Sequence, residues 1–128
     1  MTFPNRKRIL LVEDDEDAKD LCALTLDEYE LICARDFDEG VRLSQQGDFD
    51  LYILDSWLPD RSGVELCSAI REFDSETPIL FYSAAAYAHD KQEAMRAGAQ
   101  AYLTKPANPD ELIRVVRRLI SIARQKTS

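Results

Sequence analysis

The chain has 128 residues, the size of one domain, and its 24 acidic and 16 basic residues give a net charge of −8 at pH 7. A surface this acidic repels phosphate backbones and argues against direct nucleic-acid binding. No apolar stretch is long enough to span a bilayer, and the amino terminus lacks the apolar core of a secretory signal, so we expect a cytoplasmic protein without membrane contact.

Apolar, strand-like runs alternate with amphipathic stretches five times along the chain. Strands are predicted near residues 7–12, 29–34, 51–55, 79–83 and 101–104, and helices near 15–28, 37–46, 63–73, 88–97 and 109–125. This alternation is typical of an α/β protein with a doubly wound, five-stranded parallel sheet and helices on both faces. No repeat or linker interrupts the pattern, so residues 1–128 are expected to form a single domain.

Residues that start and stop helices support these boundaries. A capping residue precedes an acidic residue by three positions in three pairs: Asp36 with Glu39, Ser62 with Glu65, and Asn108 with Glu111. Gly47 and Gly98 stand where a left-handed residue would end the second and fourth helices. Asp15 is predicted to cap the first helix.

The three cysteines, Cys22, Cys33 and Cys67, are odd in number and lie far apart within apolar segments. They lack the paired spacing of a disulfide framework or a metal site. We therefore predict buried thiols in a reducing compartment.

Polar side chains follow four of the predicted strands at the point where each strand ends. Glu13 and Asp14 follow the first strand, Asp55 the third, Ser83 the fourth, and Lys105 the fifth. The carboxyl ends of parallel strands meet at one edge of the sheet, where ligands bind in open sheets, so these groups should lie together.

Three carboxylates gathered at that edge repel one another unless a cation is bound. Carboxylate oxygens, a backbone carbonyl and water suit Mg²⁺, and Mn²⁺ takes similar ligands. With the metal bound, a carboxylate can attack a phosphoryl group, because the ion neutralises charge on the transferring oxygens. The Lys105 ammonium and the Ser83 hydroxyl could then hold two phosphoryl oxygens.

These residues and their spacing resemble the receiver domain of two-component response regulators. The matching segments are Val12 to Asp14, Asp55 with Leu58 Pro59 and Ser62 Gly63, Ser83 Ala84, Gly98 Ala99, Tyr102, and Lys105 Pro106. The resemblance implies strand order 2-1-3-4-5.

The resemblance also implies a role for each residue of the site. Asp55 would be the phosphoacceptor, Asp14 a direct Mg²⁺ ligand, Glu13 a ligand through water, and the backbone carbonyl of Trp57 a further ligand. Ser83, Tyr102 and Lys105 would respond to the phosphoryl group. After phosphorylation the Ser83 hydroxyl is expected to move toward Asp55, and Tyr102 to enter the vacated space.

By the same resemblance, the chain would be a signalling switch and not a turnover enzyme. A sensor histidine kinase or a histidine phosphotransfer protein would supply the phosphoryl group. Only Lys126, Thr127 and Ser128 follow the last predicted helix, so we expect no output domain in this chain. A downstream protein, or an output domain missing here, would read the altered surface.

Two other classes of protein share parts of this pattern. An aspartate-nucleophile phosphohydrolase usually carries a second aspartate two positions after the nucleophile, where this chain has Trp57. A flavodoxin-like electron carrier would need a hydroxyl-rich loop after the first strand, and Glu13, Asp14 and Asp15 would repel the flavin phosphate.

The sequence departs from common members of the family at two positions that border the phosphoryl group, Trp57 and Ala85. Trp57 should obstruct an attacking water, and Ala85 offers no group to orient one, so we expect a long-lived phosphorylated state. We also expect a cis peptide bond between Lys105 and Pro106, which would let the lysine turn back toward Asp55.

Overall fold

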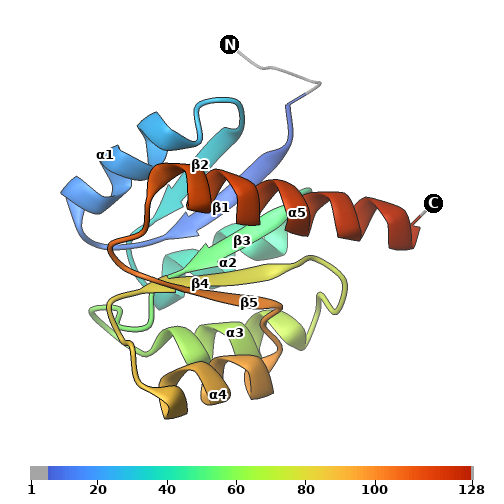
Figure 1. Cartoon of the computed structure of the whole chain (residues 1–128). Coiled ribbons are helices and arrows are strands. Elements are labelled where there is room, and N and C mark those ends of the chain that lie inside the picture. The colour runs from blue at the N-terminus through green and yellow to red at the C-terminus, as the bar shows by residue number, and fades with distance from the viewer. Residues whose placement is uncertain (1–5, 128) are drawn as a thin grey trace.

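In the computed structural model, residues 6–127 are described, and they form five strands and five helices that alternate along the chain (Figure 1). The elements are β1 (Arg8–Val12), α1 (Glu16–Thr25), β2 (Glu30–Ala34), α2 (Phe37–Gln46), β3 (Leu51–Leu54), α3 (Gly63–Arg71), β4 (Ile79–Ser83), α4 (Ala88–Ala97), β5 (Ala101–Thr104) and α5 (Pro109–Thr127). Every predicted element is present.

The strands form one parallel sheet in the order β2-β1-β3-β4-β5, which confirms the predicted topology. Strands β1, β3 and β4 occupy the centre of the sheet, and nearly every residue in them is buried. Their continuous apolar sequence follows from this position, because helices cover both faces of a doubly wound sheet.

Alternate residues of the central strands face two separate hydrophobic cores. On one face, residues such as Ile9, Ile53 and Leu80 pack with residues from α1 and α5. On the other face, residues such as Leu10 and Leu54 pack with residues from α2, α3 and α4. Figure 1 shows the same division, with α1 and α5 on one side of the sheet.

Most of the predicted helix signals are confirmed. The side chain of Ser62 accepts a hydrogen bond from the Glu65 amide at 3.1 Å, and Glu65 accepts one from the Ser62 amide at 3.3 Å. Gly98 ends α4 with a positive φ of 120°, and a β-carbon there would lie 2.8 Å from the Arg71 side chain. Asn108 differs, because its side chain accepts from the Asp110 amide at 2.8 Å and not from Glu111.

Two further predictions are wrong. Helix α1 ends at Thr25 and not near residue 28, because Leu26 leaves the helical conformation and buries its side chain in the core. Cys33 is exposed, since β2 is an edge strand of the sheet. Cys22 and Cys67 are buried, as predicted.

Within residues 6–127, no helix combines the length and apolar character that crossing a bilayer requires.

Candidate functional site

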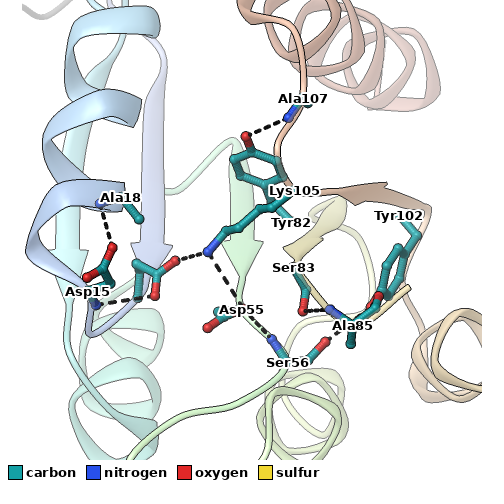
Figure 2. Close-up of polar contacts among 11 residues, drawn as sticks. Asp15, Ala18, Asp55, Ser56, Tyr82, Ser83, Ala85, Tyr102, Lys105 and Ala107 are labelled. Atoms are coloured by element: carbon teal, nitrogen blue, oxygen red, sulfur yellow. Dashed lines mark hydrogen bonds and ion pairs between the residues drawn. The ribbon is translucent and has the colours of Figure 1, made fainter. Parts of the chain in front are cut away.

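The candidate site lies at the carboxyl ends of β1, β3, β4 and β5. Glu13 and Asp14 directly follow β1, Asp55 follows β3, Ser83 is the last residue of β4, and Lys105 follows β5. Figure 2 shows the Lys105 side chain reaching toward Asp55, and the Ser83 hydroxyl bonded to the Ala85 amide. Parallel pairing produces this convergence, because it brings strand ends that are far apart in sequence to one edge.

Three carboxylates come together at this edge. Glu13, Asp14 and Asp55 can each offer an oxygen that lies within 4.8 Å of the other two. Glu13 is buried and Asp14 is exposed, so the cluster is open to solvent on one side. Asp15 stands apart from it and caps α1 by accepting a hydrogen bond from the Ala18 amide at 2.9 Å, as predicted.

Lys105 is the counter-ion of this cluster. Its ammonium donates a short hydrogen bond to Glu13 and lies 3.8 Å from an Asp55 carboxylate oxygen (Figure 2). Burial alone would lower the pKa of Lys105, but its hydrogen bond to Glu13 and the charges of both carboxylates raise it above its ordinary value. Lys105 is therefore held in its charged form beside Asp55.

Asp55 occupies an environment that disfavours its own charge. Burial raises the pKa of its carboxyl from 3.8 to about 6, against the attraction of Lys105 and with the added repulsion of Glu13. One of its oxygens accepts a hydrogen bond from the Ser56 amide at 2.9 Å. An ionised Asp55 in this position would gain from any further cation.

Ser83 and Tyr102 connect the site to the loop after β4. The Ser83 hydroxyl is fully buried and accepts a hydrogen bond from the Ala85 amide at 3.1 Å. Its interaction with Asp55 offsets part of the rise that burial causes in the pKa of Asp55. The Tyr102 hydroxyl donates to the Ala85 carbonyl at 2.5 Å and lies 3.3 Å from the Ser56 hydroxyl (Figure 2). Its ring stacks on Phe81 with centroids 5.8 Å apart.

Over residues 9–117, the sequence matches the family described as the response regulator receiver domain. The chain is 39% identical over 112 residues to transcriptional regulatory protein DltR of Streptococcus agalactiae, and the match covers 86% of this chain and 50% of that protein. The chain belongs to the receiver domain family.

Solved receiver domains agree with this assignment. A CheY-like receiver domain protein from Methanospirillum hungatei superposes with a TM-score of 0.90 at 27% identity, covering 95% of this chain and 99% of that one. The receiver domain of a Pseudomonas aeruginosa sensor histidine kinase, described with a coordinated magnesium ion in its active-site cleft, gives 0.84 at 28% identity, covering 91% and 98%. The comparisons support neither the phosphohydrolase nor the flavodoxin-like alternative. The chain spans about half the length of the curated relatives that it matches.

The expected response of Tyr102 to phosphorylation stays a prediction, and in this receiver domain the Tyr102 hydroxyl donates to the Ala85 carbonyl. Stacking on Phe81 stabilises the ring in this position. The expected cis bond between Lys105 and Pro106 is present.

Two contributors to the site, Tyr82 and Ser56, were not singled out from sequence, and Gly63 was named only as part of the family resemblance. A β-carbon at Gly63 would lie 2.0 Å from the backbone oxygen of Asp55, so this receiver domain needs glycine there. The Lys105 ammonium lies 5.5 Å from the centre of the Tyr82 ring, and the Tyr82 hydroxyl accepts from the Ala107 amide at 3.3 Å. The Ser56 amide donates a hydrogen bond to the Asp55 carboxylate. For Gly63 the helix-start signal of Ser62 was available, whereas Tyr82 and Ser56 carried no signal.

Proposed function

We propose that residues 1–128 form a receiver domain in which Asp55 accepts a phosphoryl group from the phosphohistidine of a sensor histidine kinase or histidine phosphotransfer protein. The observation that carries this proposal is the position of Asp55 beside two further carboxylates, those of Glu13 and Asp14, and beside the Lys105 ammonium. A buried ion-pair network explains the carboxylates less well, because Asp14 is exposed and Lys105 pairs with Glu13 and Asp55 instead.

The carboxylate cluster fits Mg²⁺, with Mn²⁺ as an alternative. Its donors are hard oxygens on one open edge, which leaves room for the water molecules that Mg²⁺ keeps. We assign Asp14 and Asp55 as direct ligands, Glu13 as a ligand through water, and the backbone carbonyl of Trp57 as a further ligand. The metal, when bound, would supply positive charge that offsets the negative charge on the phosphoryl oxygens.

In the proposed reaction, an Asp55 carboxylate oxygen attacks the phosphorus. A new oxygen–phosphorus bond forms as the bond from phosphorus to the donor histidine nitrogen breaks, and that nitrogen keeps the electron pair and takes a proton. Lys105 and Ser83 would hold two phosphoryl oxygens by charge-assisted hydrogen bonds. Lys105 pairs with Glu13 and would turn from it toward the phosphoryl oxygen.

The domain would act as a switch for another protein or for an output domain. Many curated relatives are named transcriptional regulatory proteins and are about twice the matched length, as DltR is. We propose a cytoplasmic location and no direct nucleic-acid contact by this domain, because a net charge of −8 repels phosphate backbones. Turnover of free substrates is not part of the proposed role.

Phosphorylation by acetyl phosphate tests the proposal. We expect wild-type protein to gain one phosphoryl group per chain in the presence of Mg²⁺, and to gain none with the metal chelated. Asp55→Asn should gain none under either condition, as judged by intact-protein mass spectrometry. Equal incorporation by Asp55→Asn would contradict the assignment, and sustained catalytic phosphate release would favour the phosphohydrolase alternative.

A further inference from the structure

The loop between Asp55 and α3 is closed on itself by backbone hydrogen bonds. The Gly63 amide donates to the Ser56 carbonyl at 2.8 Å, and the Leu58 amide donates to the Arg61 carbonyl at 3.2 Å. Trp57 and Ser62 form an antiparallel bridge. Because these bonds join the two sides of the loop, the loop should move as a unit. Its orientation then depends on the contacts of its tip, which we define as Asp60 and Arg61.

Asp60 fastens that tip to the amino terminus of α2. Its two carboxylate oxygens accept hydrogen bonds from the Phe37 amide at 2.9 Å and from the Asp38 amide at 3.3 Å. The bond from the Phe37 amide is the largest of the causes that lower the pKa of Asp60, which favours its charged form. A carboxylate also gains from the positive end of the helix dipole.

Arg61 makes a second contact with the same helix. Its guanidinium carbon lies 4.0 Å from the centre of the Phe37 ring, and its Nε donates to Glu65 at 2.9 Å. Phe37 is only 8% exposed and belongs to the core between the sheet and α2, α3 and α4. The loop tip is therefore attached to a fixed part of the fold.

Helix α2 already has a cap of its own. Asp36 accepts a hydrogen bond from the Glu39 amide at 2.9 Å, as an N-cap residue normally does. Asp60 takes the two preceding amides, which Asp36 does not reach in this structure. The two acidic residues thus stabilise the same helix end, but only Asp60 connects that end to the loop that follows Asp55.

We propose that Asp60 is a positioning residue that sets the orientation of the loop after Asp55 for metal binding. The inference rests on the proposed function, in which the Trp57 carbonyl in this loop completes the Mg²⁺ shell. Without the Asp60 carboxylate, the tip loses its hydrogen bonds to α2 and the closed loop can turn about its ends at Asp55 and Gly63. The Trp57 carbonyl then spends less time directed at the carboxylate cluster.

Paired substitutions at the two acidic residues separate positioning from helix capping. We expect Asp60→Ala to raise the dissociation constant for Mg²⁺ about tenfold, the lower end of effects seen for groups that orient metal ligands. Asp36→Ala should leave that constant within about twofold, although both variants lose a cap and unfold at lower temperature. Asp60→Asn keeps one oxygen acceptor and should give an intermediate affinity. Amide chemical shifts recorded during a Mg²⁺ titration give the constants without measuring phosphorylation.

Two results would overturn the inference, and they can be told apart. If Asp60→Ala and Asp36→Ala bind Mg²⁺ with the same affinity, Asp60 is a helix cap only and the proposed function stands. If wild-type protein binds no Mg²⁺, the proposed function fails together with the inference. Should Asp60→Ala prove too unstable to study, Asp60→Asn decides by the same comparison, with a several-fold weaker affinity than Asp36→Ala as the supporting result.

Discussion

At the scale of single residues, the candidate site is a set of charged groups that affect one another's pKa. Lys105 neutralises part of the negative charge of Glu13 and Asp55, yet the pKa of Asp55 still rises to about 6. Ionised Asp55 is therefore a local cost to the fold. A bound cation would stabilise the ionised form of Asp55, and a metal-dependent phosphoacceptor needs this property.

Replacing Asp55 should stabilise the metal-free protein at neutral pH. The folded form holds a proton on Asp55 up to about pH 6, whereas the unfolded chain releases it near 3.8, so the free energy of unfolding falls as pH rises through this window. The full shift corresponds to about 3 kcal/mol, and we expect Asp55→Asn to recover about 1 to 2 kcal/mol at pH 7 because water screens the open site. Urea unfolding in the presence of a chelator measures this.

The pH dependence is the control for that prediction. The advantage of Asp55→Asn should shrink as pH falls from 7 toward 4, since the folded protein then takes up a proton on Asp55 and no longer holds the buried charge. Asp14→Asn, at the exposed member of the cluster, should change stability less. If Asp55→Asn is less stable than wild type at pH 7, or more stable by the same amount at every pH, burial does not govern the charge of Asp55.

Trp57 provides the second residue-scale prediction. Its side chain is 62% exposed at the rim beside Asp55, whereas Ala85 is buried and brings no polar side chain to the site. A bulky ring at this rim should hinder the water that hydrolyses the phosphoaspartate. Trp57→Asn should shorten the lifetime of phosphorylated protein about tenfold, or ~1.4 kcal/mol of barrier. Phosphate release after removal of the phosphodonor measures the lifetime.

Trp57→Phe keeps an aromatic ring at the rim and should retain most of the lifetime. An unchanged or longer lifetime in Trp57→Asn would rule out shielding by this side chain.

At the scale of elements, the start of α3 positions the phosphoacceptor. Because a β-carbon at Gly63 would meet the backbone oxygen of Asp55, Gly63→Ala must push α3 away from the end of β3. We expect it to lower the free energy of unfolding by about 1 to 3 kcal/mol and to slow phosphorylation. Gly40→Ala is a matched control, since its nearest neighbours are side-chain ends of Leu66 and Val12. Equal phosphorylation rates in both variants would contradict this role.

The loop after β4 is the element that connects the site to α4 and β5. Ala85 links them, since its amide donates to Ser83 and its carbonyl accepts from Tyr102. A change at Ser83 can therefore reach Tyr102 through this one residue. Phosphorylation would then act by shifting a population, by as much as the two arrangements differ in their affinity for the phosphoryl group.

At the scale of the whole molecule, much of the fold could be predicted from sequence. The alternation of apolar runs with amphipathic stretches identifies the strands and helices. The fully buried strands β1, β3 and β4 read as continuous apolar runs, and parallel pairing then placed Asp55 beside Lys105. Contacts between separate loops and helices carried no such signal. The hydrogen bonds of Asp60 to α2 and of Tyr102 to Ala85 depend on three-dimensional placement that no local pattern encodes.

The two wrong predictions, the end of α1 and the burial of Cys33, also concern features that tertiary structure decides. The end of α1 is decided by the burial of Leu26, and the exposure of Cys33 by the edge position of β2. Local propensity predicts neither, because each depends on which neighbours cover the residue.

The central claim is that a phosphoryl group on Asp55, held with Mg²⁺, alters the face formed by α4 and β5. Amide chemical shifts recorded with and without beryllofluoride and Mg²⁺, in wild type and Asp55→Asn, test it most directly. We predict that wild type responds around Asp55 and also between Ala86 and Tyr102, only when both additions are present, and that Asp55→Asn does not respond. An equal response in Asp55→Asn, or wild-type changes confined to the loops around Asp55, would contradict the account.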